Sequence, residues 1–154
     1  MAITVIHQII IQKKGDTIVY ATNIPSTNIK YLKQKFISKA NNLHSYDGDS
    51  LILTKQEKSY ILNQLEKLKK YKWSNSLFTK SKSVTGEQVW NGLAKDMFWE
   101  VHEFSKPIFI RDNSVCLVYY MHFFGVGGPS YFGFFKEQNG QWKEWISIYS
   151  GILN

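Results

Sequence analysis

Two runs of strand-forming side chains occupy the first part of the chain. Residues 3–12 and 17–24 are rich in Ile, Val, Thr and Tyr, and Gly15-Asp16 between them is a tight-turn signal. This pattern predicts an N-terminal β-hairpin that ends at Pro25.

The next segment has the three- and four-residue spacing of an amphipathic helix. Ser26 or Thr27 can cap its start. The apolar positions that predict its buried face are Ile29, Leu32, Phe36, Ala40 and Leu43. Lysines supply the opposite face, at positions Lys30, Lys33, Lys35 and Lys39. Residues 46–50 then have the composition of a loop.

A second amphipathic helix is predicted after residue 53. Thr54 and Glu57 have the spacing of a capping box, in which each side chain satisfies an amide of the first turn. The apolar stripe behind it is Ile61, Leu62, Leu65 and Leu68. We expect this helix to end near residues 71–73, followed by a polar connector over 74–86 and by one or two helical turns over 87–94.

The last third of the chain predicts an antiparallel sheet of four or five strands. The strand-like runs are residues 97–104, 107–110, 115–124, 131–137 and 141–149. Asn139-Gly140 suits the positive φ angles of a type I′ hairpin turn. Both alternating sets of residues 115–124 are largely apolar, as in a central strand covered on both faces. The predicted fold class is α+β, with an N-terminal hairpin, two main helices and this sheet.

Length and composition limit the class of protein further. The chain has 154 residues, and five Trp, nine Tyr and ten Phe supply a large apolar core. We expect a single α+β domain over residues 1–154. One cysteine cannot form an internal disulfide, and no Cys/His spacing suggests a zinc site, so no cofactor is expected.

The apolar runs are too short to span a bilayer, and the N-terminus lacks the parts of a secretion signal. We therefore expect no membrane insertion and a cytoplasmic location, or a periplasmic one if an export signal has been removed.

Charge is divided unequally along the chain. Residues 30–82 carry 12 Lys against 4 Asp or Glu, whereas residues 83–154 carry 5 Lys or Arg against 7 Asp or Glu. A basic helical half favours a partner with an acidic face. The residues expected to form the interface are Lys67, Lys69, Lys70 and Lys72 with the aromatic Tyr71 and Trp73.

A second candidate surface is the glycine-rich link between two aromatic strands. It lacks the lysine and the following helix of a phosphate-binding loop, so we expect a long hairpin loop that can carry binding residues. The residues of this rim are Phe124, Gly125, Gly127, Gly128 and Tyr131.

Few residues suggest catalysis. Cys116 and His122 could form a nucleophile and base, but on one strand they would lie roughly 20 Å apart. Glu100 and His102 would point to one side of a strand together, yet two ligands do not make a metal site. We expect Glu103 to lie on the same polar strand and assign no catalytic residue.

Several segments resemble a group of small proteins common in Bacteroidetes-type bacteria, for which no function is assigned. The resemblance rests on residues 104–109, 115–120 and 135–143, and on the helix within residues 51–73. Many of those proteins carry cysteines in the glycine loop, and this chain has none there. The resemblance implies an accessory, binding or toxin-immunity role and supplies no catalytic residue.

These observations favour a non-enzymatic protein-binding module, most concretely an immunity-type inhibitor of a bacterial toxin. Two alternatives stay open at this point. One is a nucleic-acid-binding protein that uses the lysine-rich helical face. The other is a small-ligand-binding protein or enzyme with a pocket near His102, Cys116 and His122.

Overall fold

A computed structural model describes residues 1–10, 18–91, 100–124 and 127–153. Its elements are α1 (Ala2–Ile10), β1 (Ile18–Ala21), α2 (Ser26–Lys39), α3 (Lys55–Lys67), the 3-10 turn η1 (Leu68–Lys70), β2 (Ser81–Val84), α4 (Gly86–Trp90), β3 (Val101–Phe104), β4 (Ile108–Ile110), β5 (Val115–Phe123), β6 (Gly128–Gln138) and β7 (Gln141–Leu153). Within these ranges one seven-stranded sheet runs in the order β2-β1-β3-β5-β6-β7, and β4 also pairs with β5. The fold class is α+β, as the sequence predicts.

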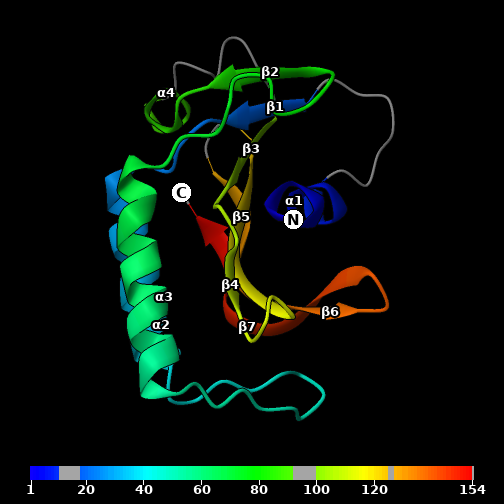
Figure 1. Cartoon of the computed structure of the whole chain (residues 1–154). Helices are drawn as coiled ribbons and strands as arrows, with labels where there is room; N and C mark the ends of the chain where they lie inside the picture. The colour runs from blue at the N-terminus through cyan, green and yellow to red at the C-terminus, as the bar shows by residue number, and fades with distance from the viewer. Residues whose placement is uncertain (11–17, 92–99, 125–126, 154) are drawn as a thin grey trace.

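The sheet separates two apolar clusters. Helices α2 and α3 lie side by side on one face, and α1 lies on the other (Figure 1). The odd-numbered residues of β5, such as Leu117 and Met121, pack toward α2 and α3. Its even-numbered residues Cys116 and Val118 pack with Val5 of α1. We call the α2–α3 side the helical face and the α1 side the aromatic face.

The N-terminal hairpin predicted for residues 3–12 and 17–24 is wrong. Residues 2–10 form α1, in which Val5 and Ile6 are completely buried on the aromatic face and Ile9 packs beside them. The four-residue step from Val5 to Ile9 fits one helix face. Burial of these side chains outweighs the low helix propensity of β-branched residues, which costs a few tenths of a kcal/mol each.

The second predicted strand exists as β1, but its partners come from far along the chain. β1 pairs in parallel with β2 from Ile18 to Ala21, and Tyr20 pairs in parallel with His102 of β3. The connector predicted over residues 74–86 therefore contains a strand. The turn predicted at Gly15-Asp16 lies outside the described residues.

Both predicted main helices are confirmed. Helix α2 buries Ile29, Leu32 and Phe36. Pro25 occupies its N-cap, and no side-chain cap forms there, so the capping role predicted for Ser26 or Thr27 is wrong. Helix α3 begins with the predicted Thr54–Glu57 capping box and buries Ile61 and Leu65.

The predicted C-terminal strands are also confirmed and are antiparallel, although residues 97–99 of the first one lie outside the described residues. The two-residue turn between β6 and β7 has positive φ at Asn139 (52°) and at Gly140 (78°), as a type I′ turn requires. The C-terminal part contains five antiparallel strands, β3 to β7, within the predicted number, and β1 and β2 extend the same sheet by parallel pairing.

Strands β3 and β4 lie end to end on one edge of β5, separated by Ser105, Lys106 and Pro107. The buried Ser105 bridges this break. Its N–H donates to the Tyr119 carbonyl at 2.9 Å, and its Oγ accepts from the Tyr119 N–H at 2.9 Å. The hydroxyl thus replaces a backbone acceptor where proline interrupts the strand.

No helix in the described ranges combines the length and the apolar character needed to cross a bilayer.

Candidate functional site

The lysines predicted to form an interface are all exposed. Lys67 ends α3, Lys69 and Lys70 belong to η1, and Lys72 follows it. Lys69 pairs with Glu66. The other three lysines make no ion pair with the described residues, so their charge is open to solvent.

Of the two aromatic residues in that predicted interface, Trp73 belongs to the core and Tyr71 packs beside it. Trp73 is buried, and its indole N–H donates to the Phe104 carbonyl at 3.1 Å. Its backbone N–H donates to the Thr22 carbonyl at 2.7 Å. Tyr71 meets the Trp73 ring edge-on at 5.1 Å, and the Lys106 ammonium lies 5.3 Å from the Tyr71 ring centre. The prediction that Trp73 is an interface anchor is therefore wrong, whereas Tyr71 is half-buried and its role stays a prediction.

A shallow groove lies on the outer side of α2, beside η1. It has a volume of about 440 Å³. Its lining includes Lys30, Lys33, Lys69 and Ile37. Lys33 and Lys69 both bond the Glu66 carboxylate, and Lys33 does so at 2.7 Å. We call Lys30, Lys33, Lys69, Lys70 and Ile37 the lysine face.

Ile37 distinguishes the lysine face from an ordinary solvated helix. Its side chain is 59% exposed although it is aliphatic. In the sequence it falls outside the apolar stripe of α2, which is the signal that could have identified it. An apolar side chain among ammonium groups offers a partner both charge and apolar contact area.

The glycine-rich rim has a structural basis of its own. Gly127 has a φ of 142°. A Cβ atom on Gly128 would lie 1.8 Å from the His122 carbonyl oxygen, so this position needs glycine. Phe124 is 46% exposed and packs against His122, with 4.2 Å between the two ring centres. Gly125 lies outside the described residues, and Tyr131 lies further along β6.

The sheet brings together two histidines that are distant in the sequence. His102 of β3 is directly opposite His122 of β5, and their rings stack at 4.4 Å. His122 Nε2 lies 3.3 Å from a carboxylate oxygen of Glu100, and His102 Nδ1 lies 3.2 Å from the Tyr120 hydroxyl. Burial, and then the charge of His122, lower the pKa of His102 to about 4.

His122 is a third potential metal ligand beside Glu100 and His102, which the sequence alone did not place there. The two rings are nearly parallel, with 11° between their planes, so their nitrogens do not converge on one point. Among the described residues, no group of three or more His, Cys, Asp or Glu is arranged to hold a metal ion. Cys116 is buried, and burial raises the pKa of its thiol to about 12, which disfavours a nucleophile.

Glu103 lies on the helical face, not on the predicted polar strand surface. Its carboxyl is buried and accepts from the Trp90 indole at 2.8 Å, the Tyr119 hydroxyl at 2.9 Å and the Asn28 amide at 3.2 Å. Burial raises its pKa to about 7 despite these donors. Because Val101 and Glu103 share a strand face, the alternation that buries Val101 also buries Glu103.

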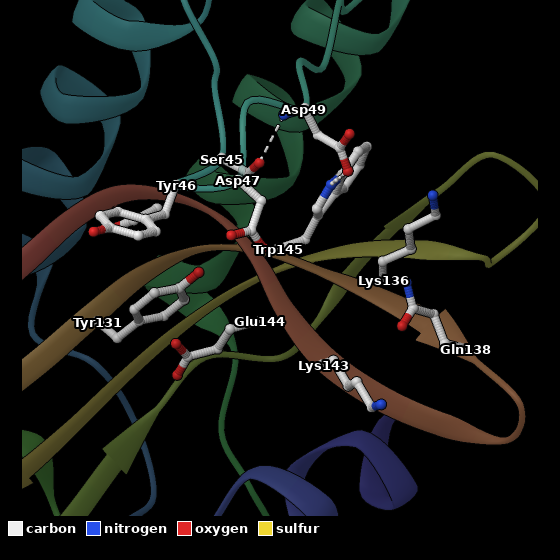
Figure 2. A pocket seen from close by; sticks show the side chains of 11 residues that line it. Ser45, Tyr46, Asp47, Asp49, Tyr131, Lys136, Gln138, Lys143, Glu144 and Trp145 are labelled. Atoms are coloured by element: carbon white, nitrogen blue, oxygen red, sulfur yellow. Dashed lines mark hydrogen bonds between the residues drawn. The ribbon is translucent and has the colours of Figure 1, made fainter.

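A second groove lies between a short hairpin and the β6–β7 pair (Figure 2). We call it the hairpin groove. Its volume is about 440 Å³, and its lining includes Tyr46, Asp47, Asp49, Tyr131, Glu144 and Trp145. Three aromatic rings and three carboxylates therefore face one solvent-open space.

The hairpin that forms one wall is closed by its own backbone. His44 and Ser50 form an antiparallel bridge, and the Ser45 N–H donates to the Asp49 carbonyl at 2.7 Å. Gly48 donates to the Ser45 carbonyl at 3.2 Å and has a φ of 89°. A glycine in the left-handed region is typical of a three-residue hairpin turn. The turn places residues 46 and 47 at the tip.

A bulge in β7 orients the opposite wall. Glu144 is opposite Phe135 and Ile146 is opposite Phe134, so Trp145 is an extra residue in the ladder. The Trp145 indole N–H donates to an Asp49 carboxylate oxygen at 3.2 Å, which ties the hairpin to the sheet.

Sequence reasoning missed this groove. Asp47-Gly48 is a turn signal, but a bulge depends on strand register, which single-strand alternation does not reveal.

Comparison of the chain with protein-family models, with curated protein sequences and with solved structures finds no match.

Proposed function

We propose that this chain is a non-enzymatic binding module that docks an acidic surface of another protein on its lysine face. The observation that carries the proposal is the exposed Ile37 among Lys30, Lys33 and Lys69 beside an open groove. Ammonium groups steer an acidic partner toward the surface, and an apolar side chain supplies contact area once it has docked.

A protein partner is favoured over nucleic acid by what the lysine face lacks. Binding of single-stranded nucleic acid relies on exposed aromatic rings on which bases stack. The aromatics next to these lysines in the sequence, Tyr31 and Tyr71, are half-buried and pack against the core. Arg111, the one arginine of the chain, donates to the Glu57 carboxylate at 3.0 Å and to the Ile52 carbonyl at 2.7 Å, so its fork is already occupied.

The narrower form of the proposal is an immunity-type inhibitor of a bacterial toxin. In that role the lysine face covers a functional surface of the toxin that is rich in Asp and Glu. A non-enzymatic role is supported by the state of the reactive groups, since Cys116 is buried and the Glu103 carboxyl already accepts three hydrogen bonds.

The test is affinity capture from nuclease-treated lysate of the source cells at two salt concentrations, followed by identification and purification of the bound protein. Its dissociation constant is then measured for the wild type and for the double variant Lys30→Glu/Lys70→Glu. These lysines make no ion pair with the described residues, so the variant should fold normally. We expect binding to weaken at least about tenfold, and Ile37→Ser to weaken it by a smaller factor.

The matched control is Lys55→Glu/Lys80→Glu, which makes the same change of net charge with two exposed lysines outside the lysine face. An equal loss in the control pair would attribute binding to net charge alone and contradict the proposal. Capture of nucleic acid, with no protein retained after nuclease treatment, would favour the nucleic-acid alternative. Protection of cells that co-express the captured partner would support the immunity role.

A further inference from the structure

The hairpin groove holds two carboxylates that have no partner within the described residues. Asp47 lies at the hairpin tip and Glu144 lies on β7. The third carboxylate, Asp49, accepts from the indole of Trp145. Lys136 lies 4.8 Å from the centre of the same indole ring, so it is already engaged. The available negative charge of the groove therefore belongs to Asp47 and Glu144.

Two tyrosines lie at the same end of the groove as these carboxylates. Figure 2 shows the rings of Tyr46 and Tyr131 beside the carboxylates of Asp47 and Glu144, whereas the Lys143 side chain extends away from them. The Tyr46 side chain is fully exposed and packs on nothing. Burial and the nearby charge of Glu144 raise the pKa of Tyr131, so its hydroxyl stays protonated and can donate.

We propose that the hairpin groove binds an organic cation, an ammonium or guanidinium group, between Tyr46 and Tyr131 and against Asp47 and Glu144. Aromatic faces attract cations, and carboxylates accept their N–H donors. A volume of about 440 Å³ lies within the range of small-molecule sites. The Gly48 turn fixes the shape of the hairpin, and the Asp49–Trp145 bond ties it to the sheet, so the two walls are already positioned before the ligand arrives.

The hairpin groove is separate from the lysine face. The hairpin follows the C-terminal end of α2 (Figure 1), whereas the lysine face runs along α2 from Lys30 to Ile37 and includes η1. The two grooves share no lining residue. The protein as a whole carries a formal charge of +7, which repels free cations. Saturable binding of a cation would therefore reflect local chemistry and not bulk attraction.

The test is an NMR titration of the full chain that follows the indole N–H signal of Trp145 and the amide signal of Gly48. The probes are N-acetyl-arginine amide and its neutral isostere N-acetyl-citrulline amide. We expect saturable shifts with the arginine probe at low salt, and at least about tenfold weaker binding of the citrulline probe. Binding should weaken as salt is raised.

Two isosteric variants examine the carboxylates, Asp47→Asn and Glu144→Gln. Both positions are exposed, so the fold should persist. We expect each single variant to weaken binding of the arginine probe several-fold, and the double variant to weaken it at least about tenfold. Asp112→Asn is the matched control, because it makes the same charge change in an exposed turn that does not line the groove and should leave binding unchanged.

Spermidine and an acetyl-Gly-Arg-Gly amide peptide distinguish the source of the cation. Tighter binding of spermidine than of the peptide would indicate a free amine, and the reverse would indicate an arginine side chain of a partner. Equal binding of the arginine and citrulline probes would overturn the proposal, as would full binding by the double variant. The absence of saturable shifts with every cationic probe would also overturn it.

Discussion

The two faces of the sheet are covered in different ways. On the helical face, α2 and α3 supply long apolar stripes, so the cover consists of regular helices. On the aromatic face, the cover consists of nine residues of α1 and of the nonhelical segment that contains Trp73 and Phe78. On the aromatic face, ring contacts and single hydrogen bonds therefore hold the covering segments against the sheet. On the helical face, the apolar stripes of the two helices do so.

Tyr20 shows how the aromatic face is held together. Its ring meets Phe78 edge-on at 5.3 Å and stacks on Phe104 at 6.1 Å. Its hydroxyl accepts from the Leu77 N–H at 3.1 Å and donates to the Ser74 carbonyl. The stability of the aromatic face should therefore depend strongly on single aromatic rings.

The largest expected effect is that of Phe104→Ala on the aromatic face. Phe104 is buried and contacts the rings of Tyr20, Trp73 and Phe78. We expect the variant to lower the free energy of unfolding by about 4 kcal/mol. Urea denaturation followed by circular dichroism measures this. The variant Phe104→Leu keeps most of the apolar volume but removes the ring contacts, so we expect it to lose an intermediate amount. A Phe104→Leu variant as stable as the wild type would contradict a role for ring contacts.

A second prediction concerns the buried carboxyl of the helical face. Because the pKa of Glu103 is about 7 in the folded chain and its ordinary value is 4.5, the folded state binds the extra proton between these pH values. Stability from this group is therefore present below pH 4.5 and is lost as pH rises through 7. The advantage of the wild type over Glu103→Gln should fall by about 3 kcal/mol across that window.

Urea unfolding at several pH values checks this prediction, with Asp112→Asn as a variant of the same charge change at an exposed site. A wild-type advantage that grew with pH would show that Glu103 is ionised in the folded chain.

The neighbouring residue on the aromatic face should act in the opposite direction. The pKa of His102 is about 4 in the folded chain against an ordinary 6.5, so the unfolded chain binds the extra proton between these values. Stability from His102 is present above pH 6.5 and is lost as pH falls toward 4. The advantage of the wild type over His102→Phe should shrink by about 2 kcal/mol over this range, a value reduced for partial exposure.

The same unfolding series measures the effect of His102→Phe, which keeps a ring against His122. A wild-type advantage over His102→Phe that shrank as pH rose would contradict the expected opposite pH dependence of His102 and Glu103.

The smallest expected effect concerns the hydrogen bonds that attach α1 to the aromatic face. The Gln8 amide donates to the Gly140 carbonyl at 3.2 Å and accepts from the Trp142 N–H at 2.9 Å. Gln8→Ala removes both bonds and should cost about 1 kcal/mol. Hydrogen exchange should become faster in α1 and stay the same in α3. The control is Gln56→Ala at an exposed position of α3, which should change neither the stability nor the exchange in α1.

The parts of the fold that could be predicted from the sequence are those where one periodicity decides. The stripe from Ile29 to Phe36 and the Thr54–Glu57 box identified both main helices. In α1, the Ile- and Val-rich sequence fits both a strand and a helix, and only the tertiary position of Val5 decides. β2 has the polar composition of a loop and becomes a strand because β1 lies beside it.

The candidate surfaces divide in the same way. Exposure of Lys69 and Lys70 follows from helix geometry and could be predicted. The burial of Trp73 could not, because it depends on the carbonyl of Phe104 some thirty residues later. The hairpin groove likewise needs the register between β6 and β7, and no local pattern encodes which residue of a strand is the extra one.

The parallel pairing of β1 has a consequence for synthesis. Ile18 pairs with Ser81, so β1 leaves the ribosome about 60 residues before its first partner. At translation rates of roughly 5–20 residues per second, this delay lasts several seconds. During that time α2 and α3 can form their local turns, while β1 and the apolar side of α1 wait for β2 and β3. We therefore expect the earliest translated elements of this fold to be among the last to settle.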